Sequence, residues 1–219
     1  MKRLGVLAVV FLTATCFGFG GFDFGASLPQ YSGLNARLSE LNSYWGGDDS
    51  LGFAHPWPWI GGHGAGWIGD FTLGGRGAVT GYMARADSME VQGGGARIFL
   101  ETGYVWAPID ELWVRPVVEF GGDALLFYVH DTGSPFRDPD FSQWYVGWTV
   151  GAAPGLEVMG RLRYDLDKYV GLFAKAHYYY PVYGPNWYID DNPPGFDLEG
   201  IHLQVGIRFG RFPPWVMRI

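Results

Sequence analysis

Residues 201–210, Ile-His-Leu-Gln-Val-Gly-Ile-Arg-Phe-Gly, alternate without a break between an apolar side chain and a polar side chain or glycine. Successive side chains of a β-strand point to opposite faces, so this period of two is typical of a strand with one apolar and one polar face. A helical period does not fit the stretch. We therefore expect a β-strand whose two faces meet different environments.

The same period recurs along most of the chain and predicts an all-β protein. Every second connection between the predicted strands is short: 70–71, 107–111 and 165–168. Of the other connections, 27–59, 130–142 and 181–199 are long and only 84–90 is brief. Short turns at one end and long loops at the other indicate an antiparallel, up-and-down transmembrane β-barrel of about eight strands. The predicted strands are 19–26, 60–69, 73–83, 96–106, 112–128, 144–164, 170–180 and 201–210.

One short helix is expected in the first long loop, over residues 32–44. Ser32 is a suitable N-cap, and Leu34, Leu38 and Leu41 fall on one face of a helix. Whether the whole 27–59 segment plugs the barrel, caps it or leaves it stays open at this point.

Composition excludes several classes of protein. The 219 residues carry a net charge of −7; 48% of them are hydrophobic, 18% aromatic and 17% charged. A chain this apolar is not disordered, and its 35 glycines do not recur at every third position as in collagen. Its 15 Lys and Arg against 22 Asp and Glu argue against a nucleic-acid partner.

The first residues have the pattern of a secretory signal peptide, with a positive Met1-Lys2-Arg3 followed by an apolar run at 4–12. We expect a signal peptide at 1–18, the barrel at 19–212 and a C-terminal extension at 213–219. Cys16 is the single cysteine, so no disulfide is expected in the barrel.

The polar face of the strands indicates which side lies inside, because it carries both charges and many of the glycines. Glycine weakens a strand on an exposed surface, but inside a narrow barrel it leaves room for Arg side chains. Buried charges need partners, and this mixed set supplies them. We expect a lumen filled by an Arg/Glu network and formed by Arg76, Arg97, Glu101, Arg115, Glu119, Asp123, Glu157, Arg161, Arg163, Lys175, His177, His202 and Arg208.

These lumen residues are expected to be structural. Eight strands leave an interior just wide enough for side chains, so no open channel is predicted. His177 and His202 lie on the polar faces of neighbouring strands, but no third ligand stands at a diagnostic spacing. We predict no catalytic residue, no metal site and no cofactor.

Trp and Tyr residues gather toward the ends of the predicted strands, as in the aromatic girdles of transmembrane barrels. The predicted girdle residues are Trp106, Trp113, Tyr128, Trp144, Tyr145, Tyr164, Tyr169, Tyr178 and Tyr180.

The pattern of strands, turns and aromatic residues resembles the small bacterial outer-membrane β-barrel proteins, the class that contains the OmpA membrane domain, OmpX and OmpW. The alternating last strand, with Phe209 or Phe212 as its terminal aromatic, is similar to the assembly signal of that class. The resemblance implies a bacterial outer-membrane location, outer-membrane lipid and lipopolysaccharide as surroundings, the barrel-assembly machinery as a partner, and a monomer.

Three functions remain open from the sequence. The first is a non-enzymatic outer-membrane protein of structural, adhesive or small-apolar-molecule conduit type. The second is a lipid-modifying enzyme of acyl transferase or deacylase type, for which Ser134 and Ser142 lie near His130 and Asp131 in one loop. The third is a soluble, secreted, lipocalin-like binding barrel, which has the same period with its faces reversed.

Overall fold

The structure, a computed structural model, describes residues 18–29, 32–44, 56–86, 89–109, 111–131, 142–164, 168–188 and 199–211. The expected signal peptide and C-terminal extension therefore lie outside the described residues, apart from Gly18. Nine strands and one helix are present in the described part of the chain. They are β1 (Gly18–Pro29), α2 (Ser32–Tyr44), β2 (Trp57–Ile68), β3 (Phe71–Ala86), β4 (Met89–Tyr104), β5 (Trp106–Ile109), β6 (Leu112–Asp131), β7 (Ser142–Tyr164), β8 (Lys168–Tyr188) and β9 (Gly200–Arg211).

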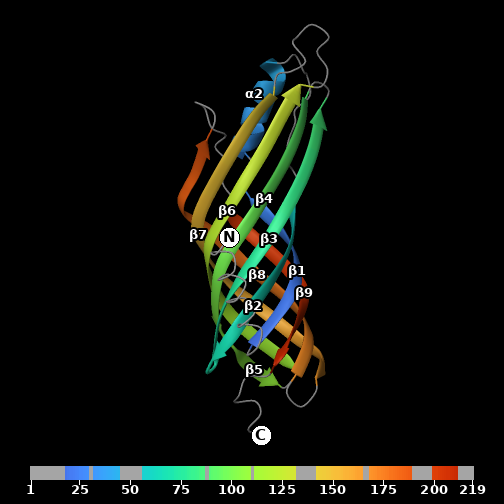
Figure 1. Cartoon of the computed structure of the whole chain (residues 1–219), viewed down its shortest axis with the longest axis vertical. Coiled ribbons are helices and arrows are strands. Elements are labelled where there is room, and N and C mark those ends of the chain that lie inside the picture. Colours follow the sequence, from blue (N-terminus) through green and yellow to red (C-terminus); the bar gives the residue numbers. More distant parts are fainter. Residues whose placement is uncertain are drawn as a thin grey trace, which may run out of the picture.

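The strands form one antiparallel sheet that closes on itself as a tilted cylinder (Figure 1). Strands β1 to β4 and β6 to β9 pair in sequence order, and the pairings of β1 with β9 and of β4 with β6 close the cylinder. Eight strands thus form the wall, which confirms the predicted all-β, up-and-down antiparallel barrel.

Two elements supplement the eight-stranded wall. The short strand β5 pairs with the start of β6, where the sequence predicts a plain turn over 107–111, so the expected count of eight strands is exceeded by one. The predicted helix is present as α2 with the expected bounds. Within the described residues, no helix is long and apolar enough to cross a membrane.

The outer surface of the barrel is apolar, and its interior is charged. Large hydrophobic side chains on all eight wall strands are exposed, among them Phe24, Ile60, Val79, Ile98, Phe120, Leu156, Leu172 and Val205. The alternate positions on the same strands carry buried Arg, Lys, Asp, Glu and His. A soluble lipocalin-like barrel has the opposite arrangement, whereas a transmembrane barrel needs apolar side chains facing outward.

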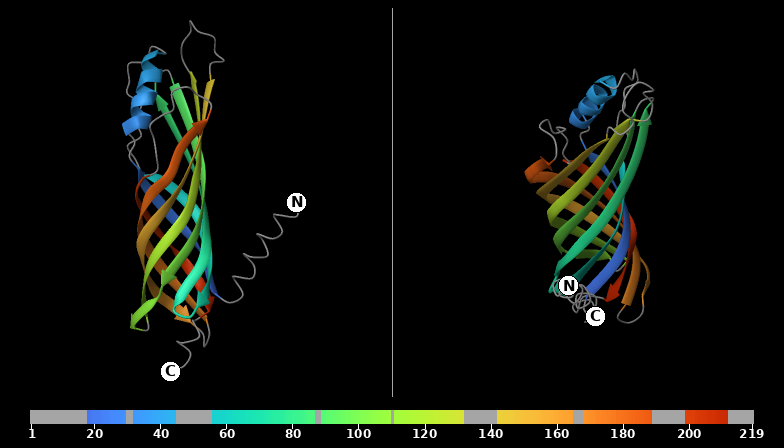
Figure 2. Two further views of the ribbon diagram at one scale, coloured as in Figure 1. Left: turned by 90° about the vertical axis from the view of Figure 1, so that its left-hand side faces the viewer. Right: turned by 45° about the horizontal axis from the view of Figure 1, so that its top comes forward.

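Several strands are longer than a membrane crossing requires. A transmembrane strand needs about 9–11 residues, whereas β6 has 20, β7 has 23 and β8 has 21. In Figures 1 and 2, β3, β4, β6 and β7 continue above the cylinder, and α2 lies beside their upper ends. The short-turn end of the barrel is at the bottom of these views.

Candidate functional site: the barrel interior

The interior of the barrel is arranged in three layers along its axis. An apolar cluster fills the loop end, a charged layer fills the middle and a second apolar cluster fills the short-turn end. The wall strands deliver these side chains by their alternation, since every second residue of each strand points inward.

Glu157 on β7 joins two arginines in the charged layer. Its Oε2 accepts hydrogen bonds from Arg115 Nη2 at 2.9 Å and from Arg208 Nη2 at 2.7 Å. Arg115 also donates to Glu101 and, at 2.9 Å, to the hydroxyl of Thr72. Arg115 and Glu157 therefore connect five strands across the lumen, β3, β4, β6, β7 and β9.

Asp23 on β1 forms a second centre. Its Oδ1 accepts from Arg76 Nη2 at 2.9 Å, and its Oδ2 lies 3.2 Å from His63 Nδ1. Arg208 Nε donates to His63 Nε2 at 3.0 Å, which leaves the proton of a neutral imidazole on Nδ1, facing the carboxylate. His63 thus links the Asp23–Arg76 pair to Arg208 and so to Glu157.

Lys175 on β8 bridges two further glutamates. Its ammonium group donates to Glu101 Oε2 at 2.6 Å and to Glu119. His177 Nε2 lies 3.5 Å from Glu119 Oε2. The amide oxygen of Gln204, turned toward β3, accepts from Arg76 Nη2 at 3.0 Å.

A fourth group of contacts surrounds Arg97 on β4. Its Nε donates to Asp123 Oδ1 at 2.8 Å, and its Nη1 lies 2.8 Å from His202 Nδ1. Ser27 Oγ lies 3.0 Å from the same nitrogen and accepts from Trp59 Nε1 at 2.7 Å. The Arg97 guanidinium also lies 3.7 Å from the Trp59 ring centroid, a cation–π contact.

The charges of this layer balance. The buried side chains of the described residues include five carboxylates and five Lys or Arg cations; the acids are Asp23, Glu101, Glu119, Asp123 and Glu157, and the bases are Arg76, Arg97, Arg115, Lys175 and Arg208. Each of them is at most 4% exposed. Balanced and directly paired charges are the condition under which ions can be retained in a low-dielectric interior.

Glycines give these long side chains their space. At Gly103 a Cβ atom would lie 3.1 Å from Arg115 Cγ, and at Gly155 it would lie 2.5 Å from His177 Cβ. An alanine at Gly155 would therefore meet the backbone of the next strand and the histidine together.

Apolar clusters enclose the charged layer at both ends. At the loop end, Leu38 of α2 packs with buried residues that include Trp57, Met89, Phe127 and Tyr179. At the short-turn end, the cluster consists of Phe19, Ala65, Val105, Trp113, Met159, Tyr169 and Phe173. Within the 27–59 segment, the helix α2 thus caps the loop-end cluster through Leu38.

The structure brings together most of the lumen residues that the sequence predicts. Eleven of the thirteen are buried in the interior and take part in the contacts above; they are Arg76, Arg97, Glu101, Arg115, Glu119, Asp123, Glu157, Lys175, His177, His202 and Arg208. Arg161 is half-buried near the Trp113 ring, 5.9 Å from its centroid. The side chain of Arg163 lies outside the described residues.

Sequence reasoning missed several members of the layer. Asp23 and His63 are buried in it, as are Ser27 and Thr72. Asp23 stands between the exposed Phe22 and Phe24, so the period of two contained the signal. For His63 no such signal exists, because its strand is too rich in glycine to show two faces.

The predicted aromatic girdle requires a correction. Trp113, Tyr145 and Tyr169 are buried in the interior, at 4%, 3% and 1% exposure, so their predicted membership of the girdle was wrong. Each of the three stands at a position of its strand whose side chain points inward. Trp113, for example, lies two residues before the buried Arg115 and therefore on the same face. Adjacent residues such as Trp144 and Tyr145 lie on opposite faces, so only one of them can face the lipid. Trp106, Trp144, Tyr178 and Tyr180 are exposed, Tyr128 is half-buried, and the side chain of Tyr164 lies outside the described residues.

The histidines and the loop serines with possible roles in metal binding or catalysis do not form a site within the described residues. His177 and His202 stack with ring centroids 5.1 Å apart, and no group of three or more His, Cys, Asp or Glu in the described ranges is arranged to hold a metal ion. His130 is half-buried on the outer face, where its ring stacks on Tyr128. Ser134 and the side chains of Ser142 and Asp131 lie outside the described residues.

No protein-family model matches the sequence, and no curated protein matches it either. Among solved structures, similarity is found to Ail, the attachment invasion locus protein of Yersinia pestis. The alignment covers 89% of this chain and 98% of that chain, with a TM-score of 0.42 and 7% sequence identity. At this identity the similarity carries no information on ligands or partners.

Proposed function

We propose that this chain is an integral protein of the bacterial outer membrane whose barrel is a closed, rigid anchor. The observation that carries the proposal is the reversed barrel: exposed hydrophobic side chains surround a buried, charge-balanced interior. In water this surface would be a very large apolar patch, whereas in hydrocarbon it is favourable. Export by the N-terminal signal peptide belongs to the same proposal.

The interior supports an anchor better than a conduit. The ion pairs of Glu157, Arg115 and Arg208 cross the lumen, and apolar clusters lie above and below them. Opening a path would require separating buried ion pairs. Leaving one buried charge without its partner costs about 3–5 kcal/mol. The Arg/Glu network is therefore proposed as a structural core that occludes the barrel.

The loop end is then the candidate surface for a structural or adhesive role. The hairpins β3–β4 and β6–β7 continue beyond the cylinder there, with α2 beside them (Figure 2). At the other end of the barrel, the described residues show only the turn at 69–70 and the small β5–β6 hairpin. We infer that the long hairpins face the cell exterior.

The proposed surroundings follow from the closed sheet. Because β1 pairs with β9 from Phe19 to Pro29, the barrel wall has no free edge at the junction of its first and last strands, which supports a monomer. The apolar outer wall supports outer-membrane lipid, including lipopolysaccharide at the loop end, as its environment. Insertion through the barrel-assembly machinery is part of the same proposal.

Conductance in planar bilayers tests the closed interior. The refolded protein, shown to be folded by a mobility shift between unheated and boiled samples on a gel, is expected to give no steady ion current. The matched variant is Arg115→Ala with Glu157→Ala, which removes the central pair and is expected to raise the frequency of brief openings. Large, stable conductance of the wild-type protein would contradict the proposal of an occluded anchor.

A further inference from the structure

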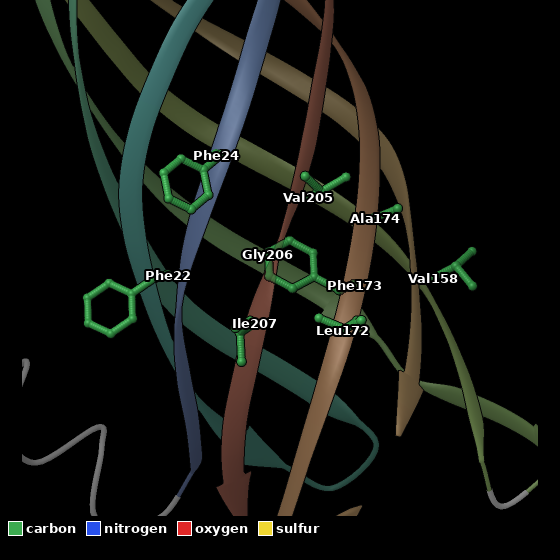
Figure 3. A pocket seen from close by; sticks show the side chains of 9 residues that line it. All are labelled: Phe22, Phe24, Val158, Leu172, Phe173, Ala174, Val205, Gly206 and Ile207. Carbon is green, nitrogen blue, oxygen red and sulfur yellow. The ribbon is translucent and has the colours of Figure 1, made fainter. Parts of the chain in front are cut away.

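The outer wall of the barrel carries a groove over strands β8 and β9. Its volume is about 480 Å³. Figure 3 shows Phe22 and Phe24 of β1 along one side, Val158 of β7 on the other, and Leu172, Ala174 and Ile207 between them. The small side chain of Ala174 leaves the depression between larger neighbours.

Two basic residues stand at the short-turn end of the same strand pair. Moving from the groove toward that end, the cross-strand pairs on the outer face are Leu172 with Ile207, then Val170 with Phe209, then Lys168 with Arg211. A second hollow of about 300 Å³ is lined by Lys168, Val170, Phe209 and Arg211. The charged hollow and the apolar groove therefore follow each other along one strand pair.

The position of these two cations is unusual for this protein. Among the described residues, the exposed basic side chains are Arg85, Lys168 and Arg211, and two of the three oppose each other here. An anionic group placed beside this pair would interact favourably with both charges.

We propose that this surface is a binding site for one phospholipid with an anionic headgroup, in the leaflet that meets the short-turn end of the barrel. Lys168 and Arg211 bind the phosphate, Val170 and Phe209 contact the first part of an acyl chain, and the groove at Ala174 holds the rest of that chain. The order of charge and apolar surface matches the order of headgroup and hydrocarbon along a lipid. The inference rests on the proposed membrane insertion and adds a defined lipid partner to it.

The test uses nanodiscs of phosphatidylcholine that contain a trace of phosphatidylglycerol with a photoreactive group in its acyl chain, and a parallel sample with the same group on phosphatidylcholine. Asp165 and Asp167 precede β8 in the sequence and lie outside the described residues. The comparison of anionic with zwitterionic lipid therefore measures whether the net charge of this end favours an anionic headgroup. Cross-linked peptides are identified by mass spectrometry. We expect phosphatidylglycerol to label Leu172 and Ile207 in excess over phosphatidylcholine.

Charge variants test the headgroup site. Lys168→Gln and Arg211→Gln are each expected to lower the preference for phosphatidylglycerol about fivefold, equal to about 1 kcal/mol per cation near a lipid surface. The matched control is Arg85→Gln, which removes an exposed arginine at the opposite end of the barrel and is expected to leave the preference unchanged.

A groove variant tests the acyl-chain site without touching the charges. Ala174→Phe fills the groove and is expected to abolish the excess labelling at Leu172 and Ile207. Ala96→Phe introduces the same side chain at an exposed position of β4 and is expected to have no effect on it. This pair of variants keeps the test decisive if a charge variant does not fold.

The outcomes separate this site from the proposed function. Equal labelling by the two lipids, or a preference that survives both the charge variants and Ala174→Phe, overturns the lipid site while the membrane barrel stands. A wild-type protein that is labelled by neither lipid anywhere on its apolar wall overturns the membrane barrel itself.

Discussion

Glu157 illustrates how a single side chain inside the barrel depends on its partners. It is 2% exposed and accepts hydrogen bonds from Arg115 and Arg208, which reach it from different strands. A carboxylate in this position is retained only because both cations are held in place by the wall. Removing the carboxylate leaves two buried arginines with one anion fewer between them.

Replacing this carboxylate, as in Glu157→Gln, is expected to lower the free energy of unfolding by about 3–5 kcal/mol, the cost of breaking a buried ion pair by removing one partner. Urea titration of the protein in lipid vesicles, followed by the gel mobility shift, measures the change. Glu90→Gln is the control, since Glu90 bonds Gln92 on the exposed face, and its effect is expected to stay within about 0.5 kcal/mol. Equal effects of the two substitutions would show that the interior pairs do not stabilise the fold.

Two glycines of β7 form a natural comparison. A Cβ atom at Gly155 would lie 2.5 Å from His177 Cβ and 2.6 Å from the Ala176 carbonyl oxygen, whereas one at Gly160 meets nothing within 4 Å. Gly155→Ala is expected to destabilise by about 1–3 kcal/mol through overpacking, and Gly160→Ala by less than about 0.5 kcal/mol. The same urea titration decides, and a Gly155→Ala protein as stable as Gly160→Ala would contradict the packing described for the lumen.

At the scale of the strands, the period of two predicts most of the fold and a large part of the interior. All eight wall strands lie where alternation predicts them, and the inward positions of β4, β6 and β9 contain the predicted Arg97, Arg115 and Arg208. This works because a closed barrel with lipid outside and charges inside allows each side chain only one of two faces.

The same rule explains what the sequence does not predict. Where glycine replaces the side chains of both faces, as around His63 on β2, alternation is invisible and the residue is missed. Where aromatic residues occupy both faces, as at Trp144 and Tyr145, a girdle cannot be told from an internal cluster by composition alone. The three-layered interior follows from tertiary position along the barrel axis, which alternation does not encode.

The helix α2 adds a prediction at the same scale. Leu38 is 2% exposed and belongs to the loop-end cluster, so Leu38→Ala is expected to release the helix from the cluster. Truncating a buried leucine costs about 2–5 kcal/mol. Here we expect that loss to weaken the packing of α2 against the loop-end cluster and not the barrel wall. Limited proteolysis is expected to cleave the 27–59 segment faster, while the barrel keeps its gel mobility shift.

The control on the same helix is Ala36→Ser, at an exposed position, for which no change in cleavage is expected. Loss of the whole barrel in Leu38→Ala would show instead that the cap and the cylinder form one cooperative unit. Unchanged cleavage would contradict the contact between α2 and the interior.

In the whole molecule, a membrane barrel with a charged core has one face of every wall strand in contact with hydrocarbon and the other face in contact with the charged interior. Strand β9 offers both kinds of position side by side: Leu203 and Ile207 are exposed, whereas His202, Gln204 and Arg208 are at most 3% exposed. A soluble barrel with the same alternation would bury the first set and expose the second.

Labelling with a small photoreactive probe dissolved in the lipid phase tests this requirement most directly. In vesicles, the probe is expected to modify Leu172, Leu203 and Ile207 and to leave His202, Gln204 and Arg208 unmodified, as resolved by mass spectrometry of the peptides. Modification of His202, Gln204 and Arg208, or of neither set in a protein that stays in solution without detergent, would contradict the membrane barrel with a charged core.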